Sequence, residues 1–296
     1  MIKKIKRRFI IYNMLVISIS ILILAFAVLI GSDQPISLRR WLVTAVIAII
    51  VVYISSQIIS AAAIAPIKEA WQRQLNFTAD ASHELRTPLA VIQTNLELVV
   101  GNPQDTVAEQ SQWLENSLFE TRRMSNIVND LLLLSRADSE TNLINAETTN
   151  LSLTMEAALR SLVPLAAPKD IVMQSNIQKD IYLHGDAKLL TQLVVILTDN
   201  AIKYMNSPGS VNISLVSQGK EIILKVSDTG EGIAAEDLKH IFDRFYRVDK
   251  SRSRDDGGTG LGLPIAQWIV SSHKGSIKVN STIGAGTEFI VTFPKA

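Results

Sequence analysis

The sequence predicts a multi-domain membrane protein with two transmembrane helices, an antiparallel helical hairpin forming a dimeric four-helix bundle, and a two-layer α/β sandwich. Three observations support this fold class. The mean hydropathy of the 296-residue chain is positive, +0.22, and the apolar excess lies before Ala65. Apolar residues at heptad spacing follow, and the remaining sequence mixes helical and strand patterns.

The composition excludes several classes of protein. A disordered chain needs low hydrophobicity and high net charge, whereas this chain is 47% hydrophobic with a formal net charge of +1. The absence of cysteine excludes disulfide scaffolds, thiol catalysis and cysteine-ligated zinc or iron–sulfur sites. After Ala65 no segment is long and apolar enough to cross a bilayer, so a transporter with many spans is excluded.

Two apolar runs, 9–30 and 41–65, each have roughly the ~20 residues that a spanning helix needs. The first run is too long for a signal peptide and lacks a small-x-small cleavage site. A basic cluster precedes it and predicts a cytoplasmic N-terminus, although Arg39 and Arg40 in the outer loop oppose this assignment. That cluster comprises Lys3, Lys4, Lys6, Arg7 and Arg8.

The loop between the two spans, 31–40, is too short to fold by itself or to enclose a ligand. We therefore expect sensing within or beside the membrane, with the lipid bilayer, a membrane transporter or another membrane sensor protein as partner. The alternative interpretation is that the spans are bare anchors. Fewer than twenty residues separate Ala65 from His83, so the second span is expected to lead directly into the next helix.

Residues 67–134 predict two helices separated by a break at Gly101-Asn102-Pro103. An apolar stripe at spacings of three and four marks each helix. Because two amphipathic helices cannot enclose a core, we expect a dimeric four-helix bundle. The stripes comprise Leu85, Leu89, Ile92, Leu96 and Val99, then Met124, Ile127, Leu131 and Leu134.

His83 lies about 200° around the helix from Leu85, away from the stripe, so it is expected in solvent. A lone histidine is more often structural than catalytic. Here Glu84 and Thr87 accompany it, and an exposed imidazole with a pKa near ~6.5 is a competent nucleophile at neutral pH.

The sequence from Leu151 onward predicts helices interleaved with strands, after a polar linker over 141–150. A helix is expected over 187–204 and another over 264–271. The predicted strands are 171–177, 211–216, 222–226, 276–280 and 288–293.

Two glycine-rich stretches, 228–233 and 257–263, stand at the ends of predicted elements. Glycines before a helix free backbone N–H groups to bind phosphate, although glycines also simply make turns. Neither stretch fits a P-loop, and no βαβ unit surrounds the second, which excludes a Rossmann motif.

The segment FTADASHELRTPL, 77–89, resembles the phosphoacceptor box of bacterial sensor histidine kinases over its whole length. The resemblance implies that His83 accepts the phosphoryl group and that Glu84 is the base that takes its proton. It also implies that Thr87 orients water when the kinase works as a phosphatase. The family's common HAMP relay has no room in this chain.

Five further stretches, in order, resemble the ATP-binding boxes of the same family: 199–204, 228–233, 241–246, 258–263 and 284–289. They imply the Bergerat ATP-binding fold, with ATP and Mg²⁺ as ligands. By this resemblance Asp228 binds the adenine amino group, Asn200 holds Mg²⁺, and Lys203 and Arg247 reach the phosphates. The other implied ATP-binding residues are Tyr204, Gly230, Gly232, Ile233, Gly258, Thr259, Gly260, Leu261, Gly262 and Thr287.

Ile196 departs from the family pattern. The ATP-binding box that contains Asn200 usually opens with an asparagine four residues before it, and the related ATPases carry a water-activating glutamate at that position. Isoleucine cannot activate water, so we expect slow direct hydrolysis.

The sequence therefore predicts a membrane-bound protein-histidine kinase with a cytoplasmic N-terminus and cytoplasmic kinase domains. The expected domains are a membrane part (1–65), a dimerisation and phosphotransfer part (66–140), a linker (141–150) and an ATP-binding part (151–296). The expected partners are a second copy and a response regulator in trans, with no nucleic acid. Two alternatives stay open: a nucleotide-binding phosphatase or scaffold, and a Bergerat-type ATPase.

Overall fold

The computed structural model describes residues 38–137, 144–205, 208–248 and 258–295, with isolated residues between 12 and 26. It divides into two units, 1–79 and 80–296, each described by itself. The predicted span 9–30 lies for the most part outside the described residues. Among the residues that are described, no helix combines the length and apolarity needed to cross a membrane.

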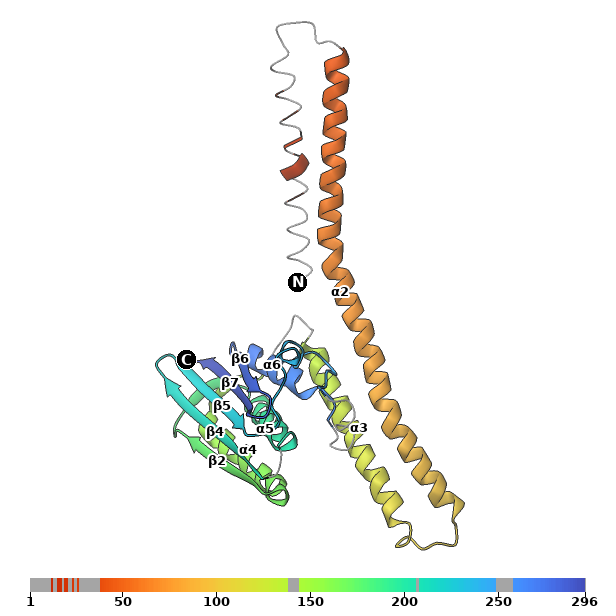
Figure 1. Ribbon diagram of the computed structural model, residues 1–296, viewed down its shortest axis with the longest axis vertical. Helices are drawn as coiled ribbons and strands as arrows, with labels where there is room; N and C mark the ends of the chain where they lie inside the picture. Colours follow the sequence, from red (N-terminus) through yellow and green to blue (C-terminus); the bar gives the residue numbers. More distant parts are fainter. Residues whose placement is uncertain are drawn as a thin grey trace. The chain divides into compact units, whose positions relative to one another are not determined.

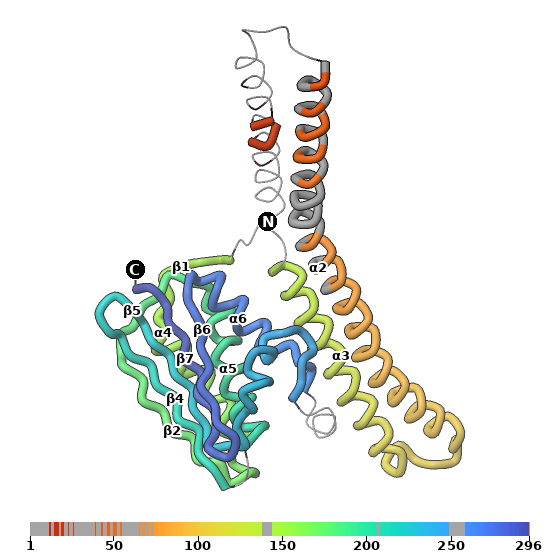
Figure 2. The backbone as a smooth tube through the Cα atoms, turned by 45° about the horizontal axis from the view of Figure 1, so that its top comes forward, coloured from red at the N-terminus to blue at the C-terminus, as the bar shows by residue number. Residues whose placement is uncertain are grey.

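The helical hairpin consists of α2 (Leu38–Gly101) and α3 (Ser111–Ala137), which run antiparallel over their facing parts (Figures 1 and 2). α2 ends at the predicted break. The Gln110 side chain closes the turn by donating to the carbonyl oxygens of Val99 and Asn102, at 3.1 and 2.8 Å. Thr106 caps the turn by donating through its backbone N–H to Glu109, at 2.7 Å.

The buried stripe of α2 differs from the predicted one. Pro88 and Asn95 are buried, whereas Leu89 and Leu96 are 55% and 44% exposed. The stripe was predicted to be buried in a dimeric bundle, so the burial of these two leucines stays a prediction, and a single chain leaves them exposed. One partner helix covers a face narrower than a full heptad stripe, and Leu89 and Leu96 lie about 100° beyond Pro88 and Asn95.

The C-terminal part is a two-layer sandwich with three helices packed together beside a five-stranded sheet (Figure 2). The strand order is β2-β4-β5-β7-β6, in which only β2 and β4 are parallel. The helices are α4 (Leu151–Ala166), α5 (Ala187–Lys203) and α6 (Gly262–Ser272). The strands are β2 (Ile171–Ile177), β4 (Gly209–Gln218), β5 (Glu221–Asp228), β6 (Ser276–Thr282) and β7 (Gly286–Pro294).

All five predicted strands and both predicted helices of this part are confirmed to within a few residues. Two short strands, β1 (Glu147–Asn150) and β3 (Tyr182–Gly185), were not predicted and pair with each other. The expected linker 141–150 thus ends in a strand: Thr149 donates to the Gly185 carbonyl at 3.1 Å, and Asn150 caps α4. One-turn 3-10 helices occur at Ala167–Lys169 and Asp237–Lys239.

A buried histidine fixes the start of α5. His273, 5% exposed, donates from Nδ1 to the Ile269 carbonyl at 2.7 Å and accepts from the Asp186 N–H at Nε2, at 2.9 Å. Asp186 in turn caps α5 by accepting from two backbone N–H groups. This clamp ties the end of α6 to the start of the helix that carries Asn200 and Lys203.

Candidate active site

One end of the site is built around Asp228, where β5 ends. Its Oδ1 accepts from the backbone N–H of Gly230 at 2.9 Å and of Thr287 at 3.1 Å. Burial raises the pKa of Asp228, and these two hydrogen bonds oppose the rise. Because both bonds go to Oδ1, the other carboxylate oxygen can accept from a ligand.

Two glycines let backbone segments of the site approach each other closely, one of them at Asp228. Gly286 has a φ of +101°, and a Cβ there would collide with the carbonyl of Asp228. Gly232 has a φ of +72°, and a Cβ there would collide with the carbonyl of Thr282. Only glycine fits such positions without displacing backbone.

Asp228 lines a cavity of about 140 Å³ whose walls are largely apolar. Asn200, Tyr204 and Thr287 also line it, with Ile233, Ile241 and Phe289 among its apolar walls. A largely apolar cavity whose wall includes the Asp228 carboxylate suits a purine base that carries an amino group.

A second cavity of about 490 Å³ continues past Asn200 and Tyr204, which line both cavities. It is lined by Lys203 from α5 and by the backbone before α6. Lys203 forms an ion pair with Asp199 at 2.6 Å. The glycine-rich backbone that borders the cavity comprises Gly258, Thr259, Gly260 and Gly262.

The start of α6 faces this second cavity without a side-chain cap. Free N–H groups and the positive end of the helix dipole favour phosphate there. Gly260 has a φ of +69°, and a Cβ there would lie 2.8 Å from the carbonyl carbon of Phe245.

Arg247 lines the first cavity, and its Nε and Nη2 are buried without a hydrogen-bond partner among the described residues. Unpaired buried guanidinium donors are costly, and a phosphate oxygen would satisfy them. The donor set of the site (an asparagine oxygen, a lysine, an arginine and glycine N–H groups) therefore fits a magnesium-bound nucleotide triphosphate.

Ile196 lines the phosphate end and lies against the start of α6: a Cβ on Gly262 would be 3.3 Å from its Cγ2. Neither a carboxylate nor an amide stands at this position, and the expected slow hydrolysis stays a prediction.

Most predicted ligand residues line one of the two cavities, but Gly230 and Leu261 line neither. Leu261 is fully buried in the core, so only its backbone borders the loop. The Ile233 N–H donates to Ser281 Oγ at 2.8 Å. Ser281 was not predicted; its hydroxyl also lies 2.9 Å from that of Thr287, and no motif in the sequence marks it.

His83 is exposed on α2, as predicted. Glu84 forms an ion pair with Arg123 of α3, with 4.0 Å between Oε2 and Nη2. Arg123 also lies 3.6 Å from Glu120. The Thr87 hydroxyl donates back to the His83 carbonyl at 3.4 Å.

Three residues of α3 form part of the wall of the phosphate cavity: Asn126, Asn129 and Asp130. None of them was predicted as a site residue. One turn further on, Leu134 is buried in the same core cluster as the residues of α5 and α6. Burial raises the pKa of Asp130 to about 6.

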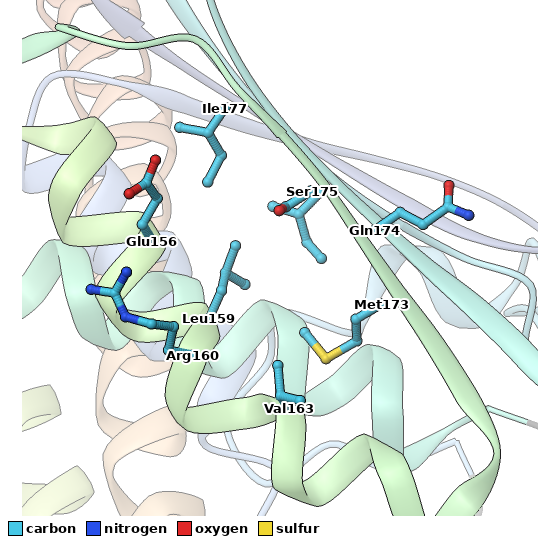
Figure 3. A pocket seen from close by; sticks show the side chains of 9 residues that line it. Glu156, Leu159, Arg160, Val163, Met173, Gln174, Ser175 and Ile177 are labelled. Atoms are coloured by element: carbon cyan, nitrogen blue, oxygen red, sulfur yellow. The ribbon is translucent and has the colours of Figure 1, made fainter.

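A third cavity, of about 380 Å³, lies between α4 and the edge strand β2 (Figure 3). Ser175 leaves it open, because this small side chain follows Met173 on the face of β2 that meets α4. Glu156 and Arg160 stand at its rim. It shares no lining residue with the other two cavities.

The fold and site define a phosphoacceptor hairpin joined to a nucleotide-binding sandwich. Residues 73–140 match the His Kinase A (phospho-acceptor) domain, and residues 185–296 match the histidine kinase-, DNA gyrase B- and HSP90-like ATPase domain. The chain is 39% identical over 249 residues to the sensor histidine kinase RppB of Synechocystis, covering 84% of this chain and 55% of RppB.

Two solved structures share the fold. The histidine kinase AdeS of Acinetobacter baumannii is 25% identical, with a TM-score of 0.59 over 72% of this chain and 97% of AdeS. The histidine kinase ThkA in complex with the response regulator TrrA is 20% identical, with a TM-score of 0.61 over 77% of this chain and 64% of that one. The chain belongs to the sensor histidine kinases of two-component systems. It spans about half the length of the curated relatives it matches.

Proposed function

We propose that this chain transfers the γ-phosphoryl group of ATP to His83 and then to an aspartate of a separate response regulator. The observation that carries the proposal is the arrangement of the cavities. An apolar cavity lined by Asp228 and by Arg247, whose Nε and Nη2 are unpaired among the described residues, leads into a second cavity with Asn200 and Lys203.

The residues divide the work as follows. Asp228 accepts from the adenine amino group, and Tyr204 covers the nucleotide. Lys203 leaves Asp199 to bind the phosphates, Arg247 binds the γ-phosphate, and the backbone of Gly258–Gly262 closes over the chain of phosphates. Asn200 would hold Mg²⁺, which offsets phosphate charge when bound.

The transfer to His83 needs in-line attack by an imidazole nitrogen on the γ-phosphorus. The bond from that phosphorus to the bridging oxygen breaks, ADP leaves, and the imidazole proton passes to Glu84. Thr87 serves the reverse task, orienting water for hydrolysis of the regulator's phosphoaspartate.

A homodimer is part of the proposal. Leu89, Ile92, Leu96 and Val100 line an open apolar groove of about 610 Å³ on α2. Exposed apolar rows of this size favour burial against another helix, and a second copy would complete a four-helix bundle.

Membrane attachment through spans 9–30 and 41–65 also belongs to the proposal, with the phosphotransfer (66–140) and ATP-binding (151–296) domains in the cytoplasm and 141–150 linking them. Its support is the sequence, together with the continuity of α2 from Leu38 to Gly101. One uninterrupted helix can carry a rotation or tilt from the second span to His83. The bilayer, a transporter or another membrane sensor would supply the stimulus.

The response regulator is proposed as the partner because ThkA, which shares the fold, has been solved with its regulator. The exposed position of His83 leaves the imidazole open to an incoming protein.

Incubation of the full-length chain in membranes with γ-labelled ATP tests the function. We expect an acid-labile, base-stable label that is lost in His83→Gln and kept in His184→Gln, a matched change at another exposed histidine. Nucleotide binding without label would indicate a scaffold or phosphatase. Steady phosphate release without labelled protein would indicate an ATPase.

A further inference from the structure

The face of α3 that meets the ATP-binding domain carries the apolar Leu134 and, one turn earlier, the acidic Asp130. Asn126, Asp130 and Leu134 follow at intervals of four, so they share this face. Leu134 is 2% exposed and belongs to the core cluster of the sandwich. It anchors α3 in a docked arrangement, in which Asp130 lines the phosphate cavity together with Asn200 and Gly258.

Asp130 has no hydrogen bond or ion pair among the described residues, although it is half-buried. The one lysine among the described residues that line the cavity, Lys203, is held by Asp199 at 2.6 Å. The docked cavity therefore presents two carboxylates against one ammonium group. Burial without a counter-ion is also what raises the pKa of Asp130 to about 6, so the carboxyl remains ionised at neutral pH.

We infer that Asp130 is a specificity-determining residue of the nucleotide site, one that opposes a triphosphate while α3 is docked. The inference rests on the proposed function. The docked arrangement accepts an empty or diphosphate-loaded site, and the additional negative charge of a γ-phosphate in the shared cavity drives α3 away.

By this inference, bound ATP favours release of α3 from the sandwich, and bound ADP favours docking. Since coupling between two equilibria is reciprocal, a carboxylate that weakens triphosphate binding when docked also makes the triphosphate release α3. Release frees the ATP-binding domain to approach His83. Loss of the γ-phosphoryl group restores the docked arrangement.

Nucleotide affinity tests the inference in the full chain, reconstituted in nanodiscs with Mg²⁺. The ligands are ADP and a non-hydrolysable ATP analogue with a nitrogen bridge. We expect Asp130→Asn to bind the analogue about fivefold more tightly, within the range of typical coupling energies, and to change ADP affinity by less than about twofold. Asp130→Glu should keep the wild-type ratio, and Asp105→Asn, in the exposed hairpin turn, should leave both affinities unchanged.

The docked arrangement can be followed directly because the chain has no cysteine. Spin labels on Ser125→Cys of α3 and Lys278→Cys of β6, both exposed, report the distance between hairpin and sandwich. The analogue, but not ADP, should lengthen it in the wild type. In Asp130→Asn the analogue should leave it short.

Three outcomes would overturn the inference. Weaker analogue binding by Asp130→Asn would mean that Asp130 holds the metal–nucleotide complex instead. Equal changes for both ligands would mean that Asp130 does not distinguish the γ-phosphate, and unchanged affinities for both ligands would mean that it has no role. A wild-type chain that binds neither ligand would instead contradict the proposed function, and the inference with it.

Discussion

The carboxylate of Glu84 lies 4.0 Å from the guanidinium group of Arg123, across the hairpin and next to His83. Arg123 is mostly buried and also faces Glu120, so one cation holds two carboxylates. The ion pair thus links the proposed base on α2 to a residue of α3.

Replacing Arg123 with methionine should loosen the hairpin. It leaves Glu84 and Glu120 without their cation, and we expect a loss of about 1–2 kcal/mol in unfolding free energy, between the values for exposed and buried pairs. Urea unfolding measures it. Arg122→Met, at the exposed neighbouring position, is the control; equal losses would show that the ion pair contributes nothing specific.

Replacing Gly286 with alanine should abolish nucleotide binding, because the new Cβ would collide with the Asp228 carbonyl. Gly284→Ala is a matched control: its φ is also positive, +76°, but no atom lies within 4 Å of the added Cβ. We expect Gly284→Ala to cost only the ~1–2 kcal/mol of left-handed strain. Calorimetric titration with ADP and thermal unfolding separate the two effects, and similar binding by both variants would refute the close approach.

Replacing Arg247 with methionine should weaken binding of the triphosphate analogue by about tenfold, because a hydrogen bond to a charged group contributes about 1.5–3 kcal/mol. ADP binding should change far less. Lys239→Met, at an exposed residue of the preceding 3-10 helix, controls for the loss of positive charge. An equal loss of ADP affinity would mean that Arg247 does not contact the γ-phosphate.

The stability difference between Asp130→Asn and the wild type should depend on pH. The folded chain raises the pKa of Asp130 from 3.8 to about 6, so it binds this proton more tightly than the unfolded chain does. The stability that comes from the protonated carboxyl is lost as pH rises through 6. Asp130→Asn should therefore be more stable than the wild type at pH 8, and the difference should shrink toward pH 5.

Thermal midpoints of both proteins between pH 5 and pH 8 measure that dependence. A constant difference for Asp130→Asn would mean that this carboxyl is not buried against the sandwich.

The sequence predicted the large elements of the sandwich because their strands are rich in β-branched residues, as in Ile290-Val291-Thr292 of β7. β1 and β3 escaped prediction since four-residue polar strands such as Glu147–Asn150 have too little apolar pattern. Their pairing depends on tertiary contacts, such as the Thr149 bond to Gly185.

The site could be predicted where a motif holds several ligand-binding residues in one short segment, as around Asp228. It could not be predicted where separate elements meet. Asp130 and Asn126 enter the cavity wall only because α3 folds back on the sandwich, and Ser281 acts through the backbone of a neighbouring turn. The heptad rule likewise missed the burial of Asn95, since spacing alone does not say how wide a face the partner helix covers.

Ile196 bears on when a bound triphosphate would be consumed. A pocket with a water-activating group there would consume its ligand at a fixed intrinsic rate, whether or not a signal had arrived. The hydrocarbon side chain of Ile196, which lies against the start of α6, cannot activate water, so this intrinsic hydrolysis would be slow. The energy of the triphosphate would then be stored until an outside nucleophile arrives, and the geometry of the encounter with His83 would decide when it is used.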